Sequence, residues 1–165
     1  MRFKMKQKIL AWGDDFTIYD ANGNKAYHVD GKVFSFGDKL DLNDAEGNTV
    51  AKIDQKLLSL GQTYDVYRIH NGEETHAARV KKRLFSFMRS KFIVDVPGPD
   101  DLEVTGSILD HEYTFERHNK TVATVSKTYF SLRDAYGIDI APSEDPVLIL
   151  AYAVVVDMIM HNDKD

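Results

Sequence analysis

The stretch VLILAYAVVVDMIM, residues 147–160, most strongly constrains what this chain can fold into. All fourteen residues except Asp157 are apolar or semi-apolar, and the run falls short of the roughly 18 residues that crossing a bilayer requires. Ser143 or Asp145 can cap a helix here, and Pro146 suits its first turn. A helix that is apolar on every side must be enclosed by protein. The sequence therefore predicts a central hydrophobic helix at the C-terminus.

The rest of the chain has the two-residue period and the turn signals of short β-strands. Residues 2–8 alternate between Arg or Lys and less polar residues, which is typical of a half-buried strand. Asn22-Gly23 and Asn71-Gly72 are hairpin signals, because tight hairpin turns need positive φ angles. About twelve strands precede the helix. A closed barrel of about twelve strands is wide enough to hold a helix 10–12 Å across. We therefore expect a mainly β fold, a closed antiparallel barrel of about twelve strands around the C-terminal helix.

Two features at turns resemble functional motifs, but we interpret them as structural. Residues 20–24 and 44–48 resemble pieces of calcium loops, yet glycine stands at the fourth position and not at the sixth, so hairpin turns are expected. A unit of a polar residue, two apolar residues, serine and an apolar residue recurs four times, which indicates repeated hairpins. Its serines are expected to bond to the backbone at bends. They are Ser35, Ser59, Ser86 and Ser131.

Length and composition limit the protein class. A chain of 165 residues fits one domain, residues 1–165. The net charge of −5 gives no global attraction to nucleic acid or to anionic membranes, so such binding would need a local patch. The chain has no cysteine, which excludes thiol chemistry and fits a reducing cytoplasm. The apolar run near the N-terminus is only four residues long, so we expect no signal peptide.

The densest basic run is the candidate binding site. It could bind an anionic lipid headgroup or another phosphate, and a plain solvated strand pair is the alternative. Strand geometry places Arg79, Lys81 and Arg83 on one face. The candidate residues are Lys81, Lys82, Arg83, Arg89 and Lys91.

Catalytic and metal-binding motifs are not found. No histidine pair has the spacing of metal ligands on a helix, and no serine lies in a nucleophile-elbow motif. We therefore expect no catalytic residue, no metal site and no cofactor. Asp157, near the end of the helix, is expected to reach the mouth of the barrel, where arginine or backbone amides would meet it.

The terminal segment IAPSEDPVLILAYAVVVDMI, the turns followed by the serine unit and the order of many strands before one helix resemble the LURP-one-related family. This family is part of the tubby-like C-terminal domain superfamily, and the resemblance covers essentially the whole chain. It implies a twelve-stranded barrel around a hydrophobic helix, as in tubby and the phospholipid scramblases. Tubby domains bind phosphoinositide headgroups through basic residues, and scramblases act at membranes. The chain lacks the cysteine-rich acylation segment of scramblases.

These observations lead to one main hypothesis and two alternatives. The main hypothesis is a non-enzymatic, cytoplasmic binding or scaffold protein that meets an anionic lipid surface peripherally, without crossing it, and does not bind nucleic acid. The first alternative is a carrier barrel for a small apolar ligand, which requires an empty apolar interior. The second is a hydrolase with an unrecognised site. Protein partners do not follow from the sequence.

Overall fold

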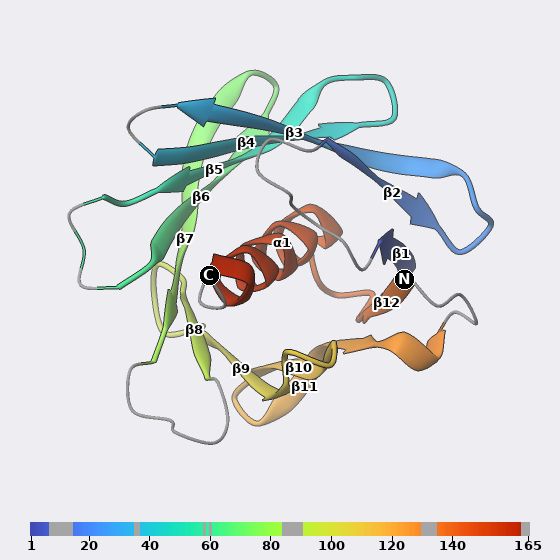
Figure 1. The fold of residues 1–165 in the computed structure, drawn as a ribbon, viewed down its shortest axis with the longest axis vertical. Coiled ribbons are helices and arrows are strands. Elements are labelled where there is room, and N and C mark those ends of the chain that lie inside the picture. The colour runs from blue at the N-terminus through green and yellow to red at the C-terminus, as the bar shows by residue number, and fades with distance from the viewer. Residues whose placement is uncertain are drawn as a thin grey trace.

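The computed structural model describes residues 1–6, 15–34, 37–57, 59, 61–83, 91–129 and 135–162. It shows a closed antiparallel barrel of twelve strands with one helix, α1, in its interior (Figure 1). The helix α1 comprises Pro146–Asn162, and a short 3-10 helix comprises Lys127–Tyr129. The strands are β1 (Arg2–Lys6), β2 (Phe16–Asp20), β3 (Lys25–Phe34), β4 (Gly37–Asp44), β5 (Thr49–Gln55), β6 (Thr63–His70), β7 (Glu73–Lys82), β8 (Phe92–Asp95), β9 (Leu102–Ser107), β10 (Glu112–Arg117), β11 (Lys120–Ser126) and β12 (Ala135–Ile140). The predicted fold is confirmed.

Each strand pairs with its neighbours in sequence, and the first and last strands close the barrel. In the closing pair, Arg2 lies opposite Asp139 and Phe3 opposite Ile138. The N-terminal ammonium also donates a hydrogen bond to the carbonyl of Ile140, at 2.6 Å. Closure leaves the barrel without unpaired edges along β1 and β12, which would otherwise be templates for aggregation.

The turns at residues 20–24 and 44–48 are hairpin turns, as predicted. In each, the aspartate carboxylate accepts hydrogen bonds from backbone amides two and four residues later. Gly23 and Gly47 have φ angles of 83° and 88°, which only glycine adopts without strain. Asp20 and Asp44 thus use their carboxylates to hold the turns together, and hydrogen bonding to the Asn24 and Asn48 amides lowers the pKa of each.

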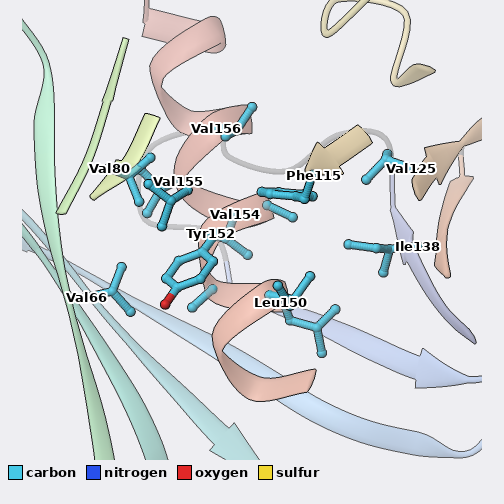
Figure 2. Packing of buried hydrophobic residues seen from close by; sticks show 14 of the residues in the cluster. Val66, Val80, Phe115, Val125, Ile138, Leu150, Tyr152, Val154, Val155 and Val156 are labelled. Carbon is cyan, nitrogen blue, oxygen red and sulfur yellow. The ribbon is translucent and has the colours of Figure 1, made fainter. Parts of the chain in front are cut away.

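The helix α1 fills the barrel. Every side chain from Ile149 to Met160 is buried, which confirms the prediction of a helix enclosed on all sides. Figure 2 shows Leu150, Tyr152, Val154, Val155 and Val156 of α1 among inward-facing side chains from the surrounding strands. Each such aliphatic side chain contributes about 1.5–3 kcal/mol when it is removed from water. The core therefore depends on α1 as much as on the strands.

Two arginines fix the start of α1 to the wall of the barrel. Asp145 caps the helix by accepting a hydrogen bond from the amide of Val147, at 2.9 Å. Arg68 of β6 donates from Nε to Asp145 at 2.8 Å, and Arg117 of β10 donates from Nη1 to Glu144 at 2.6 Å. These ion pairs orient the helix, because they join its first residues to two different strands.

The barrel has two rims, which we name after the ends of α1. The N-rim, where α1 begins, consists of the connections after β2, β4, β6, β8, β10 and β12, with the strand residue on either side of each. The C-rim, where α1 ends, consists of the described residues of the connections after β1, β3, β5, β7, β9 and β11, with their flanking strand residues. At the C-rim, Ser59 Oγ lies 3.0 Å from the carbonyl of Lys56 and 2.9 Å from that of Gly61. This confirms the structural role predicted for Ser59, whereas Ser35, Ser86 and Ser131 lie outside the described residues.

Candidate anion-binding site

The predicted basic run lies on the hairpin of β7 and β8, at the C-rim. The amide of Arg83 donates a hydrogen bond to the carbonyl of Lys91, at 2.8 Å, one residue beyond the paired Lys82 and Phe92. Residues that face each other in an antiparallel pair project to the same side of the sheet. The structure thus brings the exposed side chains of Arg83 and Lys91, eight residues apart in sequence, to opposite positions on the outer surface.

The other candidate residues occupy different positions. Lys81 is exposed on the same face of β7 as Arg83, as predicted, and its Nζ lies 4.0 Å from an oxygen of Asp95. Both side chains of that pair are about half exposed, so the pair adds little stability. Lys82 is half-buried and faces the opposite way from Lys81 and Arg83. Arg89 lies outside the described residues.

A row of threonines extends from Lys91 across the outer surface. Thr114 lies opposite Thr105 on one side and opposite Thr124 on the other. These three residues, Lys91 and Glu112 line a pocket of about 510 Å3. The Glu112 carboxylate accepts hydrogen bonds from Ser126 Oγ (2.9 Å) and from the amide of Lys127 (2.8 Å). The pocket thus offers hydroxyl groups beside the exposed cation of Lys91.

A second cluster, around the buried carboxylate of Asp65, was not predicted. Asp65 accepts hydrogen bonds from Arg79 Nε at 2.8 Å and Nη2 at 3.2 Å. Lys56 Nζ lies 3.2 Å and His76 Nε2 lies 3.1 Å from its oxygens. Although burial opposes ionisation, these donors hold the pKa of Asp65 at about 2. Arg79 is therefore paired with Asp65, whereas Lys81 and Arg83, on the same face of β7, are not.

Asp157 differs from its predicted environment. It does lie near the mouth of the barrel, beside His111 in the connection of β9 and β10 at the C-rim, but its partners are aromatic side chains and not arginine or backbone amides. Tyr136 donates its hydroxyl hydrogen to Asp157, and the His111 ring stacks on Tyr136 with centroids 4.3 Å apart. His111 Nε2 lies 3.7 Å from Asp157 Oδ1. Burial raises the pKa of Asp157 to about 7, against the opposing effect of the hydrogen bond from Tyr136. The expected partners were wrong because a tyrosine 21 residues away in sequence, Tyr136, donates the hydrogen bond to the carboxylate.

Within the described residues, no group of acidic and histidine side chains is arranged to hold a metal ion. In the same part of the chain, no helix has the length and apolarity to cross a membrane. The described site therefore consists of exposed cations and hydroxyl groups on the outer wall of a filled barrel.

Comparisons with known proteins agree with this architecture. The chain is 35% identical over 161 residues to the uncharacterized protein YxjI of Bacillus subtilis, covering 98% of this chain and 94% of YxjI. The crystal structure of the Arabidopsis thaliana protein AT5G01750 superposes with a TM-score of 0.68 at 21% identity, covering 96% of this chain and 91% of that chain. The family model described as LURP-one-related matches residues 1–157. The chain therefore belongs to the LURP-one-related family.

Proposed function

We propose that this chain is a non-catalytic, cytoplasmic binding protein that binds the phosphate of an anionic lipid headgroup between Arg83 and Lys91. The observation that carries this proposal is the hydrogen bond from the Arg83 amide to the Lys91 carbonyl, which brings two exposed cations together at one edge of the barrel. Lys81 adds a third cation to the same outer face.

The chemistry of the pair suits a phosphate. The guanidinium of Arg83 can present two parallel N–H groups to phosphate oxygens, and the ammonium of Lys91 adds a compact charge. Facing residues of an antiparallel pair have Cα atoms about 4.5–5.5 Å apart, so two long side chains can converge on one phosphate group. Threonine hydroxyls beside Lys91 can accept or donate hydrogen bonds to the polar part of a headgroup.

The alternatives are supported less well. A carrier for an apolar ligand requires an empty interior, whereas the buried side chains of α1 fill this one from Ile149 to Met160. Nucleic acid is disfavoured by the net charge of −5, which repels a polyanion outside the local patch. A hydrolase needs a nucleophile within hydrogen-bond reach of a base. Thr17 Oγ1 lies 3.3 Å from His28 Nδ1, but neither residue lines the pocket beside Lys91.

Co-sedimentation with vesicles tests the proposal. Arg83→Gln combined with Lys91→Gln should reduce binding to phosphatidylserine vesicles roughly 30-fold, since each basic residue near an anionic surface contributes about 1 kcal/mol. Lys25→Gln combined with Lys120→Gln is the matched control, because it removes the same charge from exposed residues of the N-rim. Binding should weaken as salt is added.

Three outcomes would contradict the proposal. One is equal binding to neutral and anionic vesicles, and another is binding by the Arg83/Lys91 variant equal to that of the wild type. The third is an equal loss in the N-rim control, which would mean that net charge and not this pair determines binding.

A further inference from the structure

The two rims of the barrel differ in charge. The N-rim, all of which the structure describes, has nine acidic and three basic residues. Among the described side chains of the C-rim, five are basic and three are acidic. The basic side chains of the C-rim are Lys56, Lys82, Arg83, Lys91 and Lys127. The chain is thus acidic overall but presents a positive end, which would orient it in the field of an anionic surface.

The rims also differ in exposed apolar side chains. Leu57, in the connection of β5 and β6, is 55% exposed, and Leu109, in the connection of β9 and β10, is 51% exposed. Both lie at the C-rim. Among the described residues, the other exposed large hydrophobic side chain is that of Met1, which is 43% exposed and lies beside Ile140 at the N-rim end of the barrel. Leu57 follows Lys56, whereas Leu109 precedes Asp110. Exposed apolar side chains on a rim whose described side chains carry net positive charge are a combination that peripheral membrane binding uses.

The charge difference is larger than the central helix requires. Acidic residues near the start of a helix and basic residues near its end are favourable, but this effect fades within the first and last turns. Glu144 and Asp145 already provide the acidic charge at the start of α1. Arg83 and Lys91 are exposed on the outer wall, where the helix dipole is screened. Their position is therefore explained better by a partner outside the protein.

We infer that the C-rim faces the surface of an anionic lipid bilayer, with Leu57 and Leu109 inserted between the headgroups and the acidic N-rim pointing away. This inference rests on the proposed function and adds to it the orientation of the barrel. Charge complementarity selects the bilayer as the partner, since the described side chains of the C-rim combine net positive charge with two separate exposed leucines.

The orientation can be measured with single-cysteine labels, because the chain has no cysteine of its own. Leu57→Cys and Leu109→Cys place an environment-sensitive fluorophore at the C-rim. Ala21→Cys and Ala45→Cys place it at exposed turns of the N-rim as controls. Phosphatidylserine vesicles should shift the emission of the C-rim labels to the blue, and lipids with quenchers in the interface should quench them. The N-rim labels should not respond, and phosphatidylcholine vesicles should have no effect on either pair.

A second variant tests the leucines themselves. Leu57→Ser combined with Leu109→Ser should reduce partitioning to phosphatidylserine vesicles at least fivefold, with an unchanged midpoint of chemical unfolding. Vesicle binding with responsive N-rim labels, or with unresponsive C-rim labels, would overturn the orientation and leave the proposed function standing. A complete lack of vesicle binding would overturn both. Binding of inorganic phosphate alone, without vesicle binding, would refute the membrane orientation and identify a free phosphate ligand.

Discussion

The buried Asp157 makes a specific prediction about how stability depends on pH. The carboxyl of Asp157 has a pKa of about 7 in the folded protein, against 3.8 for an ordinary aspartate. Since the folded state holds its proton more tightly, this group stabilises the fold at low pH. That contribution decreases as the pH rises from about 4 to about 7. Each pKa unit corresponds to 1.36 kcal/mol, so the whole effect amounts to about 4 kcal/mol.

Asp157→Asn isolates this effect, because asparagine has the same shape and can still accept the hydrogen bond from Tyr136. We expect the free energy of unfolding of the wild type, minus that of the variant, to fall by about 3 kcal/mol between about pH 4.5 and about pH 8. Chemical denaturation at several pH values measures this difference, and the contributions of titrating groups that do not contact Asp157 cancel. The free-energy cost of burying the asparagine amide does not depend on pH. It therefore shifts the plot of this difference against pH without changing its slope.

Tyr136→Phe provides a second variant with a predicted direction. The Tyr136 hydroxyl lowers the pKa of Asp157 by stabilising the carboxylate, so its removal should extend the pH-dependent loss of stability to higher pH. The reasoning is refuted if the difference between wild type and Asp157→Asn is independent of pH, or increases with pH. An increase would mean that Asp157 is ionised in the folded protein.

Three further predictions concern the fold. Deletion of residues 146–165 should abolish cooperative unfolding, because the barrel loses its central element; circular dichroism and a thermal scan would show this. Gly106→Ala should destabilise the fold by about 1–3 kcal/mol in chemical denaturation, because Gly106 has a φ of 132° and a Cβ there would lie 2.6 Å from the carbonyl oxygen of Glu112. Asp65→Asn should cost about 2 kcal/mol at neutral pH. Since the Asp65 pKa is lowered to about 2, this cost should shrink as the pH falls from about 4 to about 2.

The sequence was sufficient to predict the barrel and its helix because both follow from local patterns. An apolar run with a capping residue and a proline at its start predicted α1, and Asp145 does cap it. Turn signals such as Asn71-Gly72 predicted hairpins, and Asn71 and Gly72 do have positive φ angles. Because each strand pairs with the next one in sequence, a closed barrel is the arrangement in which no strand keeps an unpaired edge.

The sites were harder to predict because they depend on the register between strands. Lys56, Asp65, His76 and Arg79 come from separate parts of the sequence, and only the pairing of β6 with β7 places Asp65 opposite Arg79. A shift of one residue would move every side chain to the other face of the sheet. The row of threonines beside Lys91 also depends on the register between strands. The period of two along β7 did place Lys81 and Arg83 on one face, whereas the facing of Arg83 and Lys91 required the hairpin register.

The enclosed helix also explains why leucines can remain exposed at the C-rim. The turn leucines there are not required to cover the core, because Met158, Ile159 and Met160 of α1 are already buried. Leu57 and Leu109 therefore do not need to fold over the opening, and they remain about half exposed. Replacing either leucine by serine would remove exposed apolar surface and leave the core packing in place. The double serine variant therefore separates membrane insertion from folding.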